Sequence, residues 1–317
     1  MRDWNVTNTI NVGDLRVAYV LYTMKTTDLT PVEIHNKIYY KRDDYYAPYG
    51  KENVNGGKTR QAICLFRELK DEIKNKYNGG VVTGSSVNSP QAPIIAAVAQ
   101  DFGFKCVIGV GGTTPKTIDT HHMMRLSRHY GADIENVAGH GYTVAIDSGL
   151  KKKVISKKGY MLIKFGNSAA TNPESIFDSV ANQVENIPDK LDNLVIAVGS
   201  GIQFAGIVKG IEKFKKKVKR IIGVTFVDRS KKINEYLNQF SNLESGFKKF
   251  QDYEMYKTPL PYSKSVWEDV GNGFIDDIYE GKAHKWMREN IDTTKEKTLF
   301  WSIGRRLTAE QVDKLYK

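Results

Sequence analysis

NGGKTR, residues 55–60, separates two segments of different character. Before it, KIYYKRDDYY (residues 37–46) carries apolar and aromatic residues and is predicted to form a strand. After it, QAICLFRELKDEI (residues 61–73) has apolar residues at helical spacing. Lys58 therefore follows two glycines at a loop-to-helix junction, where a fold can bury an amine. Burial favours the neutral amine, which can form a Schiff base, although most lysines near the start of a helix are solvated charges.

The length and composition are those of a globular protein. The chain has 317 residues, of which 40% are hydrophobic, and this is enough for two domains or one large one. The N-terminal sequence lacks the apolar segment of a secretion signal, and no stretch approaches the ~18 apolar residues of a membrane span. Cys64 and Cys106 are expected in the core of a protein from a reducing compartment. We therefore expect a soluble, cytoplasmic protein with no membrane association.

The chain is basic, with 47 Lys and Arg residues against 36 Asp and Glu residues and a net charge of +11. Basic residues cluster at 151–158, 214–220, 231–232 and 305–306. A solvated basic surface is one explanation, particularly where a cluster ends a predicted helix. A nucleic-acid partner or an acidic substrate is the other.

Strand and helix patterns alternate along most of the chain. Short apolar strands are predicted at 15–24, 81–85, 105–112, 191–200, 220–228 and 297–304. Helices are predicted at 61–77, in the second half of 86–103, and at 116–137, 173–187 and 204–220. This alternation favours an α/β fold with parallel sheets.

A glycine-rich turn lies in VIAVGSGIQFAGI, residues 195–207, where an apolar strand stops and a helix begins by Phe204. Glycines allow backbone amides to approach an anion at the N-terminus of a helix, and Ser200 and Gln203 can add hydrogen bonds. Phe204 stands where the nucleotide fingerprint G-x-G-x-x-G has its third glycine, and no P-loop lysine is present. The segment is therefore either a phosphate site of another type or an ordinary strand–helix turn.

Two further segments carry polar groups near predicted helix starts. In TGSSVNSPQ, residues 83–91, the loop amides can hold a carboxylate and Asn88 can donate to a phenolate, whereas the alternative is that Ser89 only caps a helix. In DDIYEGK, residues 276–282, Tyr279 and Glu280 precede a glycine, and a glutamate at a helix start is normally a solvated charge.

Taken together, the order and spacing of these segments resemble the fold type II pyridoxal-phosphate enzymes of the tryptophan synthase β-subunit superfamily. The most similar branch is that of 1-aminocyclopropane-1-carboxylate deaminase and D-cysteine desulfhydrase, and the resemblance covers nearly the whole chain. It is carried by KIYYKRDD, GGKTR, IAVGSGIQFAGIVKG and IYEGK. The chain departs from the pattern in three places. The Asn before the lysine is missing, Val87 replaces a Ser or Gly, and Ser302 to Arg305 replace His-Thr-Gly-Gly.

The resemblance implies a role for each matching residue. Lys58 would bind pyridoxal 5′-phosphate as a Schiff base, and Tyr279 would be a catalytic acid, base or nucleophile beside the substrate. Asn88 would face the 3′ oxygen of the cofactor. Glu280 would meet its pyridine nitrogen, in place of the missing threonine. The phosphate would be held by Gly199, Ser200, Gly201, Ile202 and Gln203, and the substrate by Ser85, Ser86, Ser89, Gln91 and Tyr279.

The resemblance also implies an architecture. Two open-sheet α/β domains are expected, a large one from residues 1–58 and 155–317 and a smaller inserted one from residues 59–154, with the cofactor in the cleft between them. A homodimer is expected as well. The histidines at 121, 122, 129 and 140 have poor spacing for a shared metal, so no metal site is predicted.

The resemblance implies a pyridoxal-phosphate-dependent lyase or deaminase acting on a small amino acid through Lys58. An alternative is an enzyme that modifies an amino acid or amine tethered to a nucleic-acid base, as in DNA hypermodification. The net charge, the arginines at 305 and 306 and the altered loop at Val87 motivate it. A non-catalytic binding protein is a third possibility, against which the presence of Lys58 and Glu280 argues.

Overall fold

Two open sheets organise the chain. The computed structural model describes residues 24–166, 174–240, 253–270 and 275–316. One sheet has six strands in the order β1-β2-β10-β7-β8-β9, and the other has four in the order β5-β4-β3-β6. The predicted α/β fold with two open sheets is confirmed. Apart from Met24, the strand predicted at 15–24 lies outside the described residues.

The four-stranded sheet is entirely parallel. Its central strands are buried along nearly their whole length, and this explains why they read as continuous apolar runs. The strands are β3 (Gly80–Ser85), β4 (Lys105–Gly111), β5 (Asp133–Ala138) and β6 (Met161–Ile163), and the helices that contact them include α2 (Gln91–Asp101) and α5 (Thr143–Leu150).

The single helix predicted at 116–137 is wrong. The structure has α3 (Pro115–Thr120) and α4 (His122–His129), followed by strand β5. Between the helices His121 is extended, and after α4 Gly131 adopts a φ of +77° that ends the helical path. Strand β5 then pairs with β4, and this pairing partner lies too far away in the sequence for local periodicity to reveal it.

In the six-stranded sheet, the strand nearest the C-terminus lies in the middle. β1 (Val32–His35) pairs antiparallel with β2 (Ile38–Arg42). β10 (Thr298–Ser302) lies between β2 and β7 (Lys190–Val198) and is parallel to both. Beyond β7 follow β8 (Lys217–Thr225) and β9 (Glu254–Lys257). The position of β10 brings the residues after Ser302 beside the loop that precedes Lys58.

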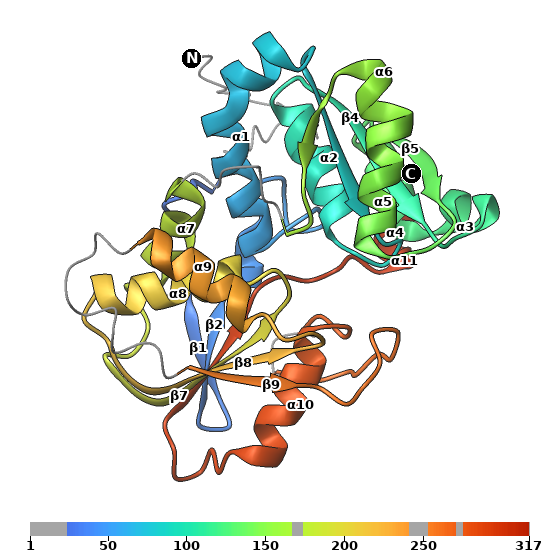
Figure 1. The fold of residues 1–317 in the computed structure, drawn as a ribbon. Helices are drawn as coiled ribbons and strands as arrows, with labels where there is room; N and C mark the ends of the chain where they lie inside the picture. Colours follow the sequence, from blue (N-terminus) through green and yellow to red (C-terminus); the bar gives the residue numbers. More distant parts are fainter. Residues whose placement is uncertain (1–23, 167–173, 241–252, 271–274, 317) are drawn as a thin grey trace, which may run out of the picture.

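Helices cover both sheets in two lobes (Figure 1). The longest is α1 (Gly57–Lys76), and the others are α7 (Glu174–Ala181), α8 (Ile202–Lys213), α9 (Ser230–Gln239), α10 (Glu280–Asn290), α11 (Ala309–Lys314) and the short α6 (Ser156–Lys158), which follows a π-helical turn at Lys151–Ile155. Single 3-10 turns occupy Asp43–Tyr45 and Asn182–Val184. The division into domains at 59 and 154 stays a prediction. Both β6 and α11 contact elements of the 59–154 region although they lie outside it.

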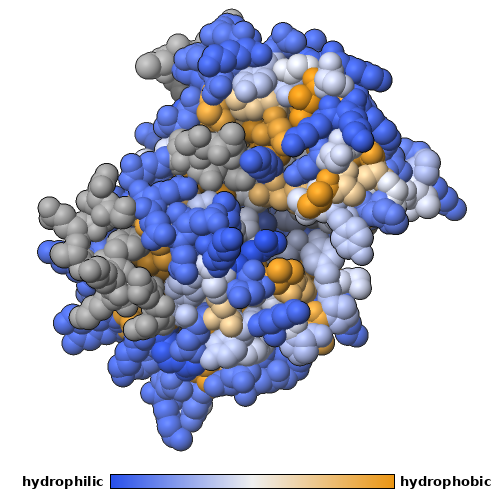
Figure 2. All heavy atoms as spheres, in the orientation of Figure 1, coloured by the Kyte–Doolittle hydropathy of each residue, from blue (hydrophilic) through white to orange (hydrophobic). Residues whose placement is uncertain are grey.

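The surface is hollowed between the two lobes, and apolar groups border the hollow on both sides (Figure 2). Among the described residues, none of the helices has the length and apolar character needed to span a bilayer.

Candidate active site

Lys58 is held in place by the tight loop before α1. The N–H of Gly57 donates to the carbonyl of Ile303 (2.7 Å), and Gly56 has a φ of +88°. A Cβ at Gly56 would lie 2.3 Å from that same carbonyl oxygen, so only glycine fits there. The two glycines therefore let the start of α1 pack directly against the chain after β10.

A cavity at the start of α1 is lined by residues from all four of the segments singled out in the sequence. Lys58, Gly199, Tyr279 and Glu280 all line it. The remaining lining residues are Asn55, Pro90, Ile94, Ala197, Asp276, Ile303, Gly304 and Arg305. The juxtaposition of the lysine with the glycine turn, about 140 residues away in the sequence, is thus present in the structure.

Burial lowers the pKa of the Lys58 amine, while the nearby carboxyl groups of Asp276 and Glu280 act in the opposite direction. Its Nζ lies 5.4 Å from the centre of the Tyr279 ring. A lowered pKa increases the fraction of neutral amine near neutral pH, and the neutral amine is the form that reacts with an aldehyde.

Glu280, at the start of α10, is 2% exposed and accepts three hydrogen bonds. One oxygen accepts from the N–H groups of Ile303 (2.7 Å) and Gly304 (3.0 Å), and the other from the Ser302 hydroxyl (2.8 Å). Burial raises the pKa of Glu280 well above its usual range, and the negative charge of Asp276 raises it further. The hydrogen bonds from Gly304 and Ser302 act in the opposite direction, because they favour the ionised carboxylate. The carboxyl group is therefore fixed in position and is poised to share a proton.

The Tyr279 hydroxyl donates to the hydroxyl of Tyr262 (3.0 Å). Burial raises the pKa of Tyr279 well above its usual range, and the neighbouring Tyr262 hydroxyl raises it further. The backbone before it is held by Asp276, which accepts from the N–H groups of Ile278 (3.0 Å) and Tyr279 (2.7 Å). Tyr279 is thus a neutral hydrogen-bonding group beside the lysine.

The glycine turn leads into α8. Gly201 has a φ of +92° and precedes the first helical residue, Ile202. A Cβ added at Gly199 would meet nothing within 4 Å, so this side of the turn is open. The Gln203 side chain is instead engaged with Asp43 (3.1 Å) and Gln61, and Ser200 packs on Gly166. The backbone amides of the turn remain the groups suited to an anion.

The polar loop after β3 does not reach the Lys58 cavity with the side chains that were predicted. The Asn88 side chain is hydrogen-bonded to His121 (3.0 Å), and the residues of this loop and helix that line the cavity are Pro90 and Ile94. Ser85 donates to the Ser86 carbonyl, Ser86 shares a hydrogen bond with Tyr262, Ser89 accepts from the Gln91 backbone, and Gln91 donates to Thr83 and Lys164. The cofactor and substrate roles of these residues stay predictions.

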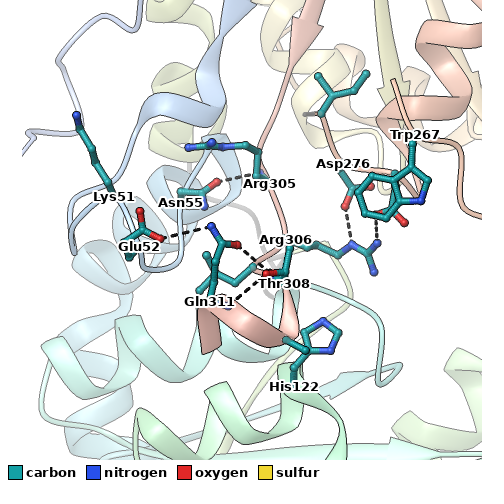
Figure 3. A pocket seen from close by; sticks show the side chains of 14 residues that line it. Lys51, Glu52, Asn55, His122, Trp267, Asp276, Arg305, Arg306, Thr308 and Gln311 are labelled. Carbon is teal, nitrogen blue, oxygen red and sulfur yellow. Dashed lines mark hydrogen bonds and ion pairs between the residues drawn. The ribbon is translucent and has the colours of Figure 1, made fainter. Parts of the chain in front are cut away.

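The sequence interpretation missed Asn55 and Asp276, which line the cavity. Asp276 stands three residues before Tyr279 in the quoted DDIYEGK segment, so the signal was present. Arg306 forms ion pairs with Asp276 (2.7 Å) and with Asp277. A second, larger chamber of about 520 Å³ adjoins this region, and Figure 3 shows the side chains around it.

The residues of the Lys58 cavity fit pyridoxal phosphate. A buried amine with a lowered pKa suits the aldehyde, the open glycine turn before α8 suits the phosphate, and the Glu280 carboxyl suits the pyridine nitrogen. All three belong to the lining of one cavity.

Comparisons with known proteins agree with this geometry. A family model described as "Pyridoxal-phosphate dependent enzyme" matches residues 25–253. Among solved structures, an ACC deaminase homologue superposes with a TM-score of 0.68 at 20% identity, covering 91% of this chain and 93% of that one. Threonine deaminase isoform 2 from Solanum lycopersicum gives a TM-score of 0.60 at 18% identity, covering 90% of this chain and 86% of that one.

Two phage proteins are similar in sequence. The O-seryl-dTMP PLP-dependent decarboxylase of Salmonella phage ViI is 34% identical over 197 residues, which is 58% of this chain and 45% of that protein. This match therefore spans a little under half the length of that relative. The Glycyl-dTMP PLP-dependent decarboxylase of Pseudomonas phage M6 is 25% identical over 293 residues, which is 87% of this chain and 98% of that protein.

Proposed function

Because the chain belongs to the pyridoxal-phosphate-dependent enzyme family, we propose that it is a decarboxylase of an amino acid bonded to a thymidine nucleotide. Its fold type II architecture, its resemblance to the ACC deaminase family and its cofactor, as predicted from the sequence, are confirmed. Of the two functions drawn from the sequence, the nucleotide-linked alternative is better supported than action on a free amino acid. Deaminase or lyase chemistry on a free amino acid is the second candidate, favoured by the deaminase folds.

The observation that carries the proposal is the similarity to two decarboxylases whose names both specify an amino acid on dTMP. The composition of the cavity supports it. Pro90, Ile94, Ala197 and Ile303 give the space around Lys58 several apolar walls. Loss of carbon dioxide removes a negative charge from the substrate, and an apolar environment favours the neutral product over the buried carboxylate.

When bound, pyridoxal phosphate supplies an electron sink for the pair released at the substrate α-carbon. The amides at Gly199 to Gly201 would bind its phosphate, and Glu280 would hold its pyridine nitrogen by a shared proton. The bond from the α-carbon to the carboxylate breaks, carbon dioxide leaves, and a proton takes its place on the α-carbon to give an amine. The Lys58 Nζ, which is buried and carries a labile proton, is the proposed donor.

Tyr279 has a positioning role in this scheme. Its ring lies under the Lys58 Nζ, and its hydroxyl is oriented by Tyr262. With a raised pKa it keeps its proton and acts as a hydrogen-bond donor, and the proton that the α-carbon receives comes from Lys58.

The test is to supply the purified protein with pyridoxal phosphate and with serine or glycine linked to dTMP, and to measure carbon dioxide and the amine product by mass spectrometry. Free serine and free glycine are the matched substrates, and Lys58→Ala is the inactive control. We expect carbon dioxide from a linked substrate only. Release of ammonia and a keto acid from a free amino acid, with no carbon dioxide from the linked ones, would show that the deaminase candidate is correct.

A further inference from the structure

We propose that the chamber beside the Lys58 cavity binds the nucleotide part of the substrate, with the thymine base against Trp267 and the phosphate near Arg305 and Lys51. The inference rests on the proposed function and extends it to residues outside the cofactor cavity. The chamber has a volume of about 520 Å³, within the roughly 300–1,000 Å³ of small-molecule sites.

The position of the chamber is the first argument. Asn55, Asp276 and Arg305 line both the chamber and the Lys58 cavity, so the two spaces share a wall. In the proposed reaction the reacting amino acid lies at Lys58, beside these shared residues. A substituent attached to that amino acid then extends past the shared residues into the chamber.

An aromatic side chain at the edge of the chamber is the second argument. The Trp267 side chain is 63% exposed although it is large and apolar. In Figure 3 its indole lies on the side of the chamber formed by the segment before α10, near the pair between Arg306 and Asp276. An exposed indole offers a flat face for stacking, and base–aromatic stacking does not depend on which base is present.

The charges of the chamber are the third argument. Six lining residues are charged: Lys51, Arg305, Arg306, Glu52, Asp276 and Asp277. Arg306 is paired with both aspartates, so these three groups largely neutralise one another. Glu52 lies on the same side of the chamber as Lys51 and Arg305 (Figure 3), and its carboxylate accepts from the Gln311 amide at 3.4 Å. Lys51 and Arg305 do not pair with these two aspartates, and Arg305 lies next to Asp44.

Arg305 is suited to a phosphate. Its side chain is 35% exposed, and its Nε lies 3.4 Å from Asp44 without forming a hydrogen bond. Asp44 already accepts two hydrogen bonds from Arg42, at 2.9 and 2.8 Å. The Arg305 guanidinium therefore retains hydrogen-bonding capacity for an additional anion, and arginine can bind phosphate through two donors.

The inference is tested by calorimetric binding of dTMP to the protein loaded with pyridoxal phosphate. Trp267→Ala should weaken dTMP binding by about 5- to 150-fold, the range expected for the loss of one stacked base. Trp286→Phe is the matched control, because Trp286 stacks on Tyr256 and does not line the chamber, and it should bind dTMP like the parent protein. Arg305→Gln should weaken binding of dTMP more than binding of thymidine, which lacks the phosphate.

Two ligand series identify the source of the nucleotide. If a thymine-containing single-stranded oligonucleotide binds more tightly than dTMP, the chamber accepts a base within DNA. If dTMP binds more tightly, the chamber accepts the free nucleotide. Either order supports the nucleotide site. Unchanged dTMP binding and unchanged KM in Trp267→Ala, with carbon dioxide still released from the linked substrate, would refute the chamber while the proposed function stands. Absence of carbon dioxide from the parent protein, with Trp267-dependent dTMP binding, would refute only the decarboxylase.

Discussion

Two replacements of Glu280 separate its contribution to stability from its contribution to the reaction. In Glu280→Ala the N–H groups of Ile303 and Gly304 lose their acceptor. Each buried N–H left unpaired costs roughly 1–3 kcal/mol, so the free energy of unfolding should fall by roughly 2–6 kcal/mol. In Glu280→Gln the amide oxygen can still accept from both groups. The Ser302 hydroxyl can rotate to accept from the amide nitrogen, and the loss should stay within about 1 kcal/mol.

The pH dependence of stability gives a second signature. Because burial raises the folded-state pKa of Glu280, the stability that this group contributes is fully present below its unfolded pKa of 4.5. As pH rises above 4.5, the unfolded chain loses this proton and the folded protein keeps it, so the free energy of unfolding falls until the folded pKa is passed. Glutamine does not titrate. The stability of Glu280→Gln relative to the parent protein should therefore increase with pH over that interval.

Urea unfolding of the cofactor-free protein at several pH values measures both effects, and decarboxylation of the linked substrate measures the chemistry. With the cofactor, Glu280→Gln should lose about 100- to 1,000-fold in turnover, because a neutral amide does not protonate the pyridine nitrogen. Equal stability of the alanine and glutamine variants would refute the structural reasoning. Full turnover in Glu280→Gln would refute the assignment of Glu280 to the pyridine nitrogen.

Lys58→Ala should abolish the absorbance above ~400 nm that added cofactor produces, and Lys41→Met, which removes another buried lysine, should keep it. Lys41→Met should also change the pH profile of urea unfolding. Burial lowers the pKa of Lys41 to about 7, so the free energy of unfolding of the parent protein should rise between pH 7 and 10.5, and that of the variant should not. Gly201→Ala puts a side chain on a residue with a φ of +92° and 2.8 Å from Ile233, and spectroscopic titration should show cofactor binding weakened by roughly 5- to 30-fold. Gly103→Ala is the control, because Gly103 has a similar φ of +72° but a Cβ there would lie in open space. Equal cofactor affinity in the two variants would contradict the role of the α8 turn.

Several features of the site are local in the sequence. Two glycines before Lys58, at the boundary between a strand pattern and a helix pattern, indicate a tightly packed helix start. The Gly199 turn likewise follows an apolar strand directly. These features could be predicted because glycine conformation and apolar periodicity depend on neighbouring residues. The family resemblance added the roles, and the cofactor followed from it.

Other features depend on long-range pairing. Strand β10 inserts between β2 and β7, and only this places Ile303 and Gly304 where they bind the Glu280 carboxyl and pack on Gly56. Which strands pair depends on the whole sheet and cannot be inferred from the alternation of apolar and polar residues within one strand. For this reason β5 was predicted as part of a helix. The orientation of a polar side chain is equally non-local.

Asn88 illustrates the point. It was predicted to bind the cofactor, but its side chain is hydrogen-bonded to His121, the residue just before α4. Arg306 is one of the two arginines that motivated the nucleic-acid alternative, yet Asp276 and Asp277 largely neutralise it. The fold class, the glycine-flanked Lys58 and the glycine turn could be predicted from the sequence, since each depends on adjacent residues. The tertiary structure alone decided which charges cancel and which side chains meet in one cavity, because these depend on segments that are brought together only when the sheets assemble.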